Sequence, residues 1–237
     1  MLVIMLALGL AIMSCSDDTT TSDGNNQGSG TPGLAFELIN NGTAYAVRSG
    51  TVMDGAVVIP ATYNGLPVTE IGSSHDVLND NGAFASKGIT SITIPSSITS
   101  IGGSAFYNCT SLTSITIPIG VKSIGLDAFR SCTSLTRVTI PASVISIGGG
   151  AFMFCTSLTS VTIPASVTSI GGGAFYNCTS IASITIPASV TSLGYGVFYG
   201  WNTQQTIYVQ GKSDFEAANM WGEVWFDLCD ASIIYER

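Results

Sequence analysis

The sequence predicts an elongated, strand-rich solenoid of stacked repeats, and three observations point to this fold class. First, the 23-residue stretch 117–139 recurs with small changes on both sides of itself. Second, runs such as 112–117 alternate apolar and polar residues, as expected of a strand with one buried face. Third, a proline follows each such run at a constant spacing of 23 residues: Pro95, Pro118, Pro141, Pro164 and Pro187.

Each repeat is expected to form one coil of the solenoid. Ile117 points inward from the strand, and Pro118 ends the strand because it has no N–H for a further ladder bond. The chain then returns Ile124 to the core, and Gly125 marks a corner where a positive φ is expected. A short helical turn over 128–132 points a phenylalanine and a cysteine inward.

Stacking places equivalent residues of successive coils on top of one another. A single coil cannot close its own core, so stability is a sum over coils and their interfaces. The prediction is therefore an α/β, strand-rich fold: a parallel β ladder with short helical turns and two interior columns of side chains. These columns are Phe106, Phe129, Phe152, Phe175 and Phe198, and Cys109, Cys132, Cys155 and Cys178.

The repeat reads Ile-Thr-Ile-Pro-x-x-Val-x-Ser-Ile-Gly-x-x-Ala-Phe-x-x-Cys-Thr-Ser-Leu, and it resembles the BspA-type leucine-rich repeat family of bacterial surface proteins and lipoproteins. The resemblance covers about residues 57–209, and Pro, Gly, Phe and Cys hold register over several copies. It implies a leucine-rich repeat solenoid. It also implies adhesion to host extracellular matrix or plasma proteins, or to other bacteria.

The two ends of the array depart from the repeat. Residues 34–88 are expected to form an N-terminal hairpin cap over 35–51 and a degenerate first repeat. An insertion at 73–82 contains His75, Asp76 and Asp80, and it is either a capping loop or a binding loop. Regular repeats follow over 89–209. Residues 210–237 mix large apolar and charged side chains, which predicts a C-terminal lid.

The first residues resemble a lipoprotein leader. Leu2 to Met13 form a 12-residue apolar run, too short for a membrane-spanning helix, which predicts a signal peptide over 1–14. The stretch 12–15 resembles a lipobox, which implies lipidation of Cys15; an ordinary secretory signal is the alternative. Polar residues 15–33 are expected to be a disordered tether. The expected location is the outer surface of the cell envelope, with secretion as the alternative.

Composition argues against several functions. Only 9% of residues are charged and the net charge is −8, so the basic stripe of a nucleic-acid-binding protein is missing. His75 is the single histidine, and no catalytic constellation or phosphate loop is found in the sequence. Parallel side chains stay too far apart for disulfides, so the ladder cysteines are expected to be buried thiols that hold no metal. We therefore expect a non-catalytic protein without cofactors.

Two groups of residues are candidates for binding. An outward ladder of hydroxyls is expected at Thr93, Thr116, Thr139, Thr162 and Thr185. Three cations lie in or beside one repeat, Lys122, Arg130 and Arg137, and predict a local positive patch for an acidic partner. Both groups have a plainer interpretation, as ordinary exposed strand residues and as solubilising charges. Tyr107, Tyr176, Tyr195 and Tyr199 are either exposed contact residues or packing residues.

The sequence thus favours a protein-binding adhesin or interaction scaffold, whose partner is a host extracellular protein or another bacterial surface protein. Two alternatives remain open. A glycan-binding module would use the hydroxyl ladder, and a structural envelope protein would have no specific ligand.

Overall fold

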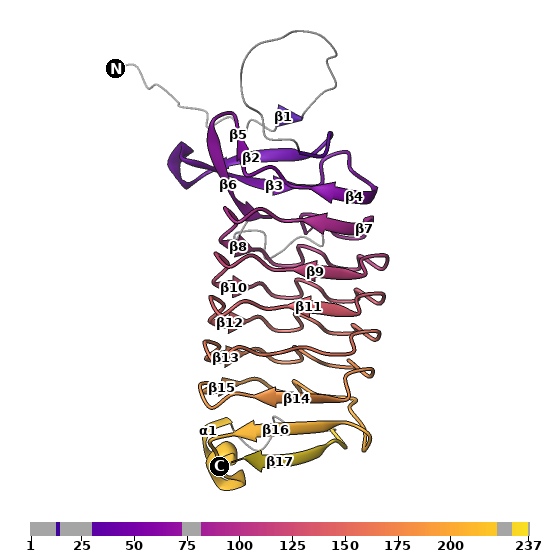
Figure 1. Cartoon of the computed structure of the whole chain (residues 1–237), viewed down its shortest axis with the longest axis vertical. Helices are drawn as coiled ribbons and strands as arrows, with labels where there is room; N and C mark the ends of the chain where they lie inside the picture. The colour runs from indigo at the N-terminus through magenta and orange to yellow at the C-terminus, as the bar shows by residue number, and fades with distance from the viewer. Residues whose placement is uncertain (1–12, 15–29, 73–81, 222–228, 237) are drawn as a thin grey trace, which may run out of the picture.

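The computed structural model describes residues 13–14, 30–72, 82–221 and 229–236 (Figure 1). It is a strand-rich solenoid whose coils stack along one long axis, with the first coils at one end and α1 (Asp214–Trp221) and β17 (Ser232–Glu236) at the other. The predicted repeat solenoid with a parallel β ladder is confirmed.

Strands form two sides of the solenoid. The first side is one sheet, hereafter the long sheet, which runs down the left of Figure 1. It joins β1 (Met13–Ser14), β2 (Ala35–Ile39), β3 (Ala44–Arg48), β6 (Leu66–Ile71), β8 (Ser100–Ile101), β10 (Ser123–Ile124), β12 (Ser146–Ile147), β13 (Ser169–Ile170) and β15 (Ser192–Leu193), with β5 (Thr62–Tyr63) paired to β6.

The second side, hereafter the opposite face, carries the strands that precede the repeat prolines and the last two strands of the chain. They form three groups: β4 (Asp54–Val58) with β7 (Gly88–Thr93), β9 (Ser114–Thr116) with β11 (Arg137–Thr139), and β14 (Ser183–Ile186) with β16 (Thr206–Gln210) and β17. Register follows the sequence period, since Ser123 pairs with Ser146 and Thr116 with Thr139.

The interior contains the predicted phenylalanine column. Phe84 begins the column one coil before Phe106, and Phe198 ends it. All six rings are fully buried, and neighbouring centroids lie 5.2 to 6.1 Å apart with the planes within 7° of parallel. Each inner ring thus uses both of its faces to hold the coils before and after it.

The predicted short helical turns are wrong in detail. Residues 126–131 form consecutive turns, and α1 is the only α-helix in the described part of the chain. The physical reason is that Ser131 has φ 60°, in the left-handed region, as do its equivalents Asn108 and Asn177. A left-handed residue in each turn prevents a continuous helix, so the fold contains far less helix than an α/β assignment suggests.

The role expected of Gly125 also needs correction. Its φ is not positive; the positive angle falls two residues later, on Asp127. A Cβ on Gly125 would instead lie 2.5 Å from the backbone carbon of Gly102 in the preceding coil. Glycine is therefore required at this corner because two backbones approach closely.

Both ends differ from the regular coils. β2 and β3 form the predicted antiparallel hairpin around η1 (Asn40–Gly42), and β3 then joins the parallel ladder through β6. Thr31, expected in the tether, exchanges two hydrogen bonds with Val58 at 2.8 and 2.6 Å. At the far end β17 pairs in parallel with β16, so the C-terminal segment adds a further strand to the ladder. His75, Asp76 and Asp80 lie outside the described residues.

We predict that Phe152→Ala lowers the free energy of unfolding by about 3–5 kcal/mol, because it leaves a cavity between the rings of Phe129 and Phe175. Urea unfolding followed by tryptophan fluorescence measures this change. Thr162→Ala on the opposite face is the control, and it should change stability by less than about 0.5 kcal/mol. Equal effects of the two variants would show that the column does not carry the stacking.

Candidate functional site

The predicted threonine ladder lies on the opposite face. Thr93, Thr116, Thr139 and Thr162 are exposed, while Thr185 is half-buried where β14 pairs with β16. Within the described residues, the four exposed hydroxyls make no side-chain hydrogen bond. Other hydroxyls are used by the fold; that of Thr136, for example, donates to the carbonyl of Thr113 at 3.0 Å. The exposed ladder is therefore available for contacts outside the chain.

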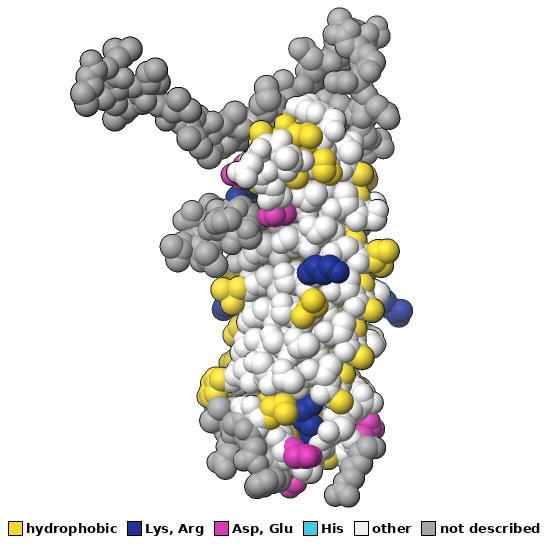
Figure 2. Space-filling view, turned by 90° about the vertical axis from the view of Figure 1, so that its left-hand side faces the viewer, with side chains coloured by type: hydrophobic (Ala, Val, Ile, Leu, Met, Phe, Trp, Pro, Cys, Tyr) yellow, Lys and Arg dark blue, Asp and Glu magenta, His cyan; other side chains and the backbone are white. Residues whose placement is uncertain are grey.

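The structure does not bring the three predicted cations together. Lys122 precedes β10 on the long sheet, whereas Arg137 lies in β11 on the opposite face. Arg130 lies in the turns between them and pairs with Asp127 at 3.6 Å. Figure 2 accordingly shows dark-blue side chains at separate places around the middle of the solenoid. Each cation belongs to a different surface, so a single positive patch does not form.

Arg130 and the tyrosines belong to a column along the turns. The Arg130 guanidinium lies 5.9 Å from the ring centroids of both Tyr107 and Phe154, within the range of a cation–π contact. Beyond it, the Tyr176 and Tyr199 rings stack at 4.4 Å with their planes 2° apart. These rings are half-buried, and the stacked faces of Tyr176 and Tyr199 cover each other. The tyrosines of this column therefore both pack against neighbours and contact water, and only part of each ring is free to bind a partner.

Tyr195 lies outside this column. It is 59% exposed and follows β15 on the long-sheet side. Among the tyrosines singled out from the sequence, it is the one whose side chain is mostly in water.

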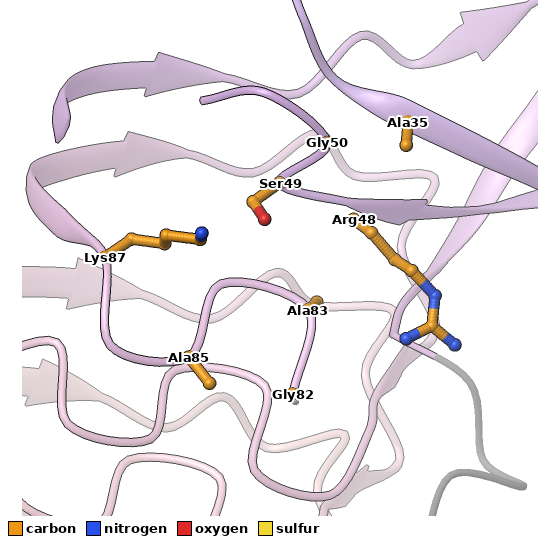
Figure 3. Close-up of a pocket in the computed structure, with 8 residues that line it drawn as sticks. All are labelled: Ala35, Arg48, Ser49, Gly50, Gly82, Ala83, Ala85 and Lys87. Atoms are coloured by element: carbon orange, nitrogen blue, oxygen red, sulfur yellow. The ribbon is translucent and has the colours of Figure 1, made fainter. Parts of the chain in front are cut away.

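A hollow of about 380 Å³ lies at the N-terminal end, where the hairpin meets the first coil (Figure 3). In Figure 3 the Lys87 amine points toward Ser49, and the Arg48 side chain leads away from both. Arg48 pairs with Glu37 at 3.5 Å, while the Lys87 amine lies 3.4 Å from the sulfur of Met53. The ammonium and the Ser49 hydroxyl give the hollow a chemistry that favours an anion.

Sequence reasoning missed this hollow because Ser49 and Lys87 are far apart in the chain. One weak signal was present in the sequence: Lys87 follows Phe84 by three residues, where a cysteine follows Phe106 in the next coil. Two hydrogen bonds confirm this alignment of the coils. The amide of Ser86 bonds to the carbonyl of Tyr107, and its hydroxyl to the side chain of Asn108. Lys87 therefore occupies the place that Cys109 has in the next coil. A lysine at this position marks the N-terminal end of the cysteine column, where the interior opens to water.

The ladder cysteines are buried free thiols, as predicted. Each Sγ donates a hydrogen bond to the carbonyl of a phenylalanine in the preceding coil: Cys109 to Phe84, Cys132 to Phe106, Cys155 to Phe129 and Cys178 to Phe152, at 3.0–3.1 Å. In the last coil Trp201 takes the same place, and its Nε1 donates to Phe175 at 2.9 Å. Cys229, near the C-terminus, is only half-buried.

Burial makes these thiols poor nucleophiles. Loss of water around the thiolate raises the pKa of Cys109 and Cys178 to about 12, and raises the pKa of Cys132 and Cys155 well above the ordinary value. No cluster of three or more metal-ligating side chains occurs in the part of the chain that the structure describes. The cysteine column is therefore structural in character.

The pKa shift predicts how stability changes at high pH. The thiol of Cys178 ionises near pH 9 in the unfolded chain but only near 12 in the fold, so its contribution to stability is complete below about pH 9 and is lost as pH rises toward 12. Between pH 9 and 11 the free energy of unfolding should fall less steeply in Cys178→Ser than in the parent, by about 1.4 kcal/mol per pH unit. Urea titrations at several pH values measure both slopes.

Serine can keep the hydrogen bond to Phe152, so this variant should remain folded. Thr162→Val is the matched control, since it removes an exposed hydroxyl that does not titrate in this range. If the free energy of unfolding falls equally steeply with pH in Cys178→Ser and in the parent, the pH dependence does not come from the Cys178 thiol.

Comparison with known proteins agrees with this geometry. Residues 80–204 match the family described as the BspA type leucine-rich repeat region, in six copies. The chain belongs to this family of bacterial leucine-rich repeat proteins. No curated protein matches the chain.

The solved structures that are similar to it include the following two. A leucine-rich repeat protein of T. pallidum is 28% identical with a TM-score of 0.61, over 80% of this chain and 93% of that one. A leucine-rich cell surface protein of Faecalibacterium prausnitzii is 30% identical with a TM-score of 0.54, and the match covers 82% of this chain but 55% of that protein. In the described residues, no helix is long and apolar enough to cross a membrane.

Proposed function

We propose that this chain is a lipid-anchored protein of the bacterial cell surface that binds other proteins through the outside of its solenoid. The observation that carries the proposal is the division of the side chains between the interior, which holds the coils together, and the surface, which does not. The aromatic and cysteine columns lie inside, while whole rows of exposed side chains, such as Thr116 and Thr139, have no part in holding the coils. A surface that is not needed for folding is free to be selected for contacts.

The solenoid is also suited to protein ligands by its shape. Its strands present long, flat rows at a spacing of about 4.8 Å, which suit an extended partner better than a small molecule. The similar protein of Faecalibacterium prausnitzii is itself described as a cell surface protein, which supports the same location here. Non-catalytic binding, as an adhesin or scaffold, agrees with the inert thiols and with the family.

The proposed anchor is Cys15, which lies outside the described residues. Processing before Cys15 would remove β1 and leave β2 paired with β3. The segment from 15 to about 29 would then connect the lipid to Thr31, where the chain first bonds to the solenoid.

We predict that Cys15→Ser moves the protein from the detergent-rich to the aqueous phase in Triton X-114 partition of cells that produce it. The physical reason is that serine cannot carry the thioether-linked lipid, which supplies the apolar surface for partition. Cys229→Ser is the matched control and should stay in the detergent phase. If Cys15→Ser also stays there, the lipid anchor is excluded.

Protein binding is tested with the full chain carrying Cys15→Ser, immobilised on a biosensor. Extracellular-matrix proteins, plasma proteins and a glycan panel are passed over it at physiological salt. We expect saturable binding to at least one protein. A thermal melting curve of the same protein, recorded in solution, confirms that the chain is folded.

The same screen separates the two alternatives. The free hydroxyls of the threonine ladder favour a glycan as the second candidate ligand. Binding to saccharides alone, lost in Thr116→Val with Thr139→Val, would replace the protein-binding proposal by a glycan-binding one. Silence of a folded chain toward every probe would favour a structural role.

A further inference from the structure

One repeat differs from the others at its outward positions. Ile119 stands where the other coils have Ser96, Ala142, Ala165 and Ala188. Lys122 stands where they have Thr99, Ile145, Thr168 and Thr191, and Leu126 where they have Gly103, Gly149, Gly172 and Tyr195. The interior positions of this same coil keep the repeat, with Phe129 and Cys132 in their columns. Its differences therefore concern the surface.

These residues form a stripe across the long-sheet side. The amide of Ile145 donates to the carbonyl of Lys122 at 2.8 Å, so the two side chains are neighbours on adjacent coils. Ile119 precedes Lys122 in the turn that leads into β10, and Leu126 follows β10. We call Ile119, Lys122, Leu126 and Ile145 the β10 stripe. Figure 2 shows yellow and blue side chains at this height on a mostly white surface.

The stripe exposes apolar surface that the fold does not use. Ile119 is 80% exposed, and Leu126 and Ile145 are each 50% exposed. Leu126 has room because Gly149 in the next coil has no side chain; a Cβ there would lie 3.2 Å from Leu126 Cδ1. Single exposed apolar residues are ordinary, but here three flank one lysine: Ile119 precedes Lys122 and Leu126 follows it in the same coil, and Ile145 lies beside it in the next coil.

The charge of the stripe has no partner in the described part of the solenoid. Residues 89–211 contain three cations and one acid, a net charge of 3 − 1 = +2, although the whole chain carries −8. That acid is Asp127, and it pairs with Arg130 at 3.6 Å. Lys122 is exposed and makes no ion pair with any residue that the structure describes. A partner that buries the stripe must therefore bring its own carboxylate to Lys122.

We propose that the β10 stripe is the docking surface for a protein segment in which apolar and acidic side chains alternate. Its apolar side chains cover Ile119, Leu126 and Ile145, and an aspartate or glutamate pairs with Lys122. This proposal rests on the proposed protein-binding function and assigns it a surface and a partner chemistry. It also separates Lys122 from Arg130 and Arg137, which belong to other surfaces.

The repeats themselves supply the test variant. Ile119→Ala, Lys122→Thr and Leu126→Gly together restore residues that other coils have at the same positions, so the fold accepts each of them. Arg137→Ser is the matched control, since it also removes a cation in favour of the repeat residue but on the opposite face. Melting temperatures of both variants are compared with that of the parent.

The probes are 12-residue peptides that alternate leucine with glutamate, a set in which lysine replaces glutamate, and a set in which serine replaces leucine. Binding to the full Cys15→Ser chain is measured by fluorescence anisotropy. We expect the Leu–Glu peptides to bind at least tenfold more tightly than either other set. The triple variant should weaken this binding at least tenfold, while Arg137→Ser changes it less than twofold.

Other outcomes overturn the proposal in distinguishable ways. Equal binding of glutamate and lysine peptides would overturn the role of Lys122. If a protein found in the biosensor screen binds the triple variant as tightly as the parent, the stripe is wrong while the protein-binding function stands. If neither proteins nor peptides bind the folded parent, the proposed function fails and the stripe with it. Peptide binding that is lost equally in Arg137→Ser would move the site to the opposite face.

Discussion

The solenoid depends on one constraint: each coil must lie directly over the next, because its backbone bonds mainly to its neighbours. The amides of Ser104, Phe106 and Asn108 all donate to carbonyls of the following coil, at 2.7–2.8 Å. Where Gly125 crosses Gly102 the two backbones leave no room for a Cβ. An insertion or deletion inside a regular coil would break these bonds in both neighbours. This constraint explains why the regular coils keep a constant period of 23 residues in the sequence.

The interior columns follow from the same stacking. Once coils lie in register, the residue beneath a phenylalanine is another phenylalanine, and the rings meet face to face. The phenylalanine carbonyl lies inside the core, where it accepts one bond from the backbone N–H three residues later, as Phe129 does from Cys132 at 3.2 Å. A carbonyl has a second lone pair that a further donor can use. The cysteine thiol donates to it while adding a small apolar volume. Trp201 keeps this second bond in the last coil, since its indole N–H replaces the thiol as donor to Phe175 although its shape is different.

The sequence was sufficient wherever period alone decides the structure. Periodicity identified the strands, the parallel register and both columns, because each of these repeats with the coil. It was insufficient where geometry within one coil decides. The left-handed φ of Ser131 and the close approach at Gly125 depend on how coils meet, and nothing in residue type distinguishes them from a helical turn or a flexible corner. Nor could β17 be predicted, since it pairs with β16 through a 26-residue offset that departs from the period.

The candidate sites show the same division more sharply. Closeness in sequence suggested that Lys122, Arg130 and Arg137 form one patch, but a coil turns through its whole circumference in 23 residues, so they reach three surfaces. Neighbours on a solenoid surface are instead residues one period apart, as Lys122 and Ile145 are. A change at one outward position costs the stack little, because the backbone bonds and columns remain. Differences between repeats can therefore accumulate on the surface without loss of the fold, and a binding specificity is best sought where such differences coincide on adjacent coils.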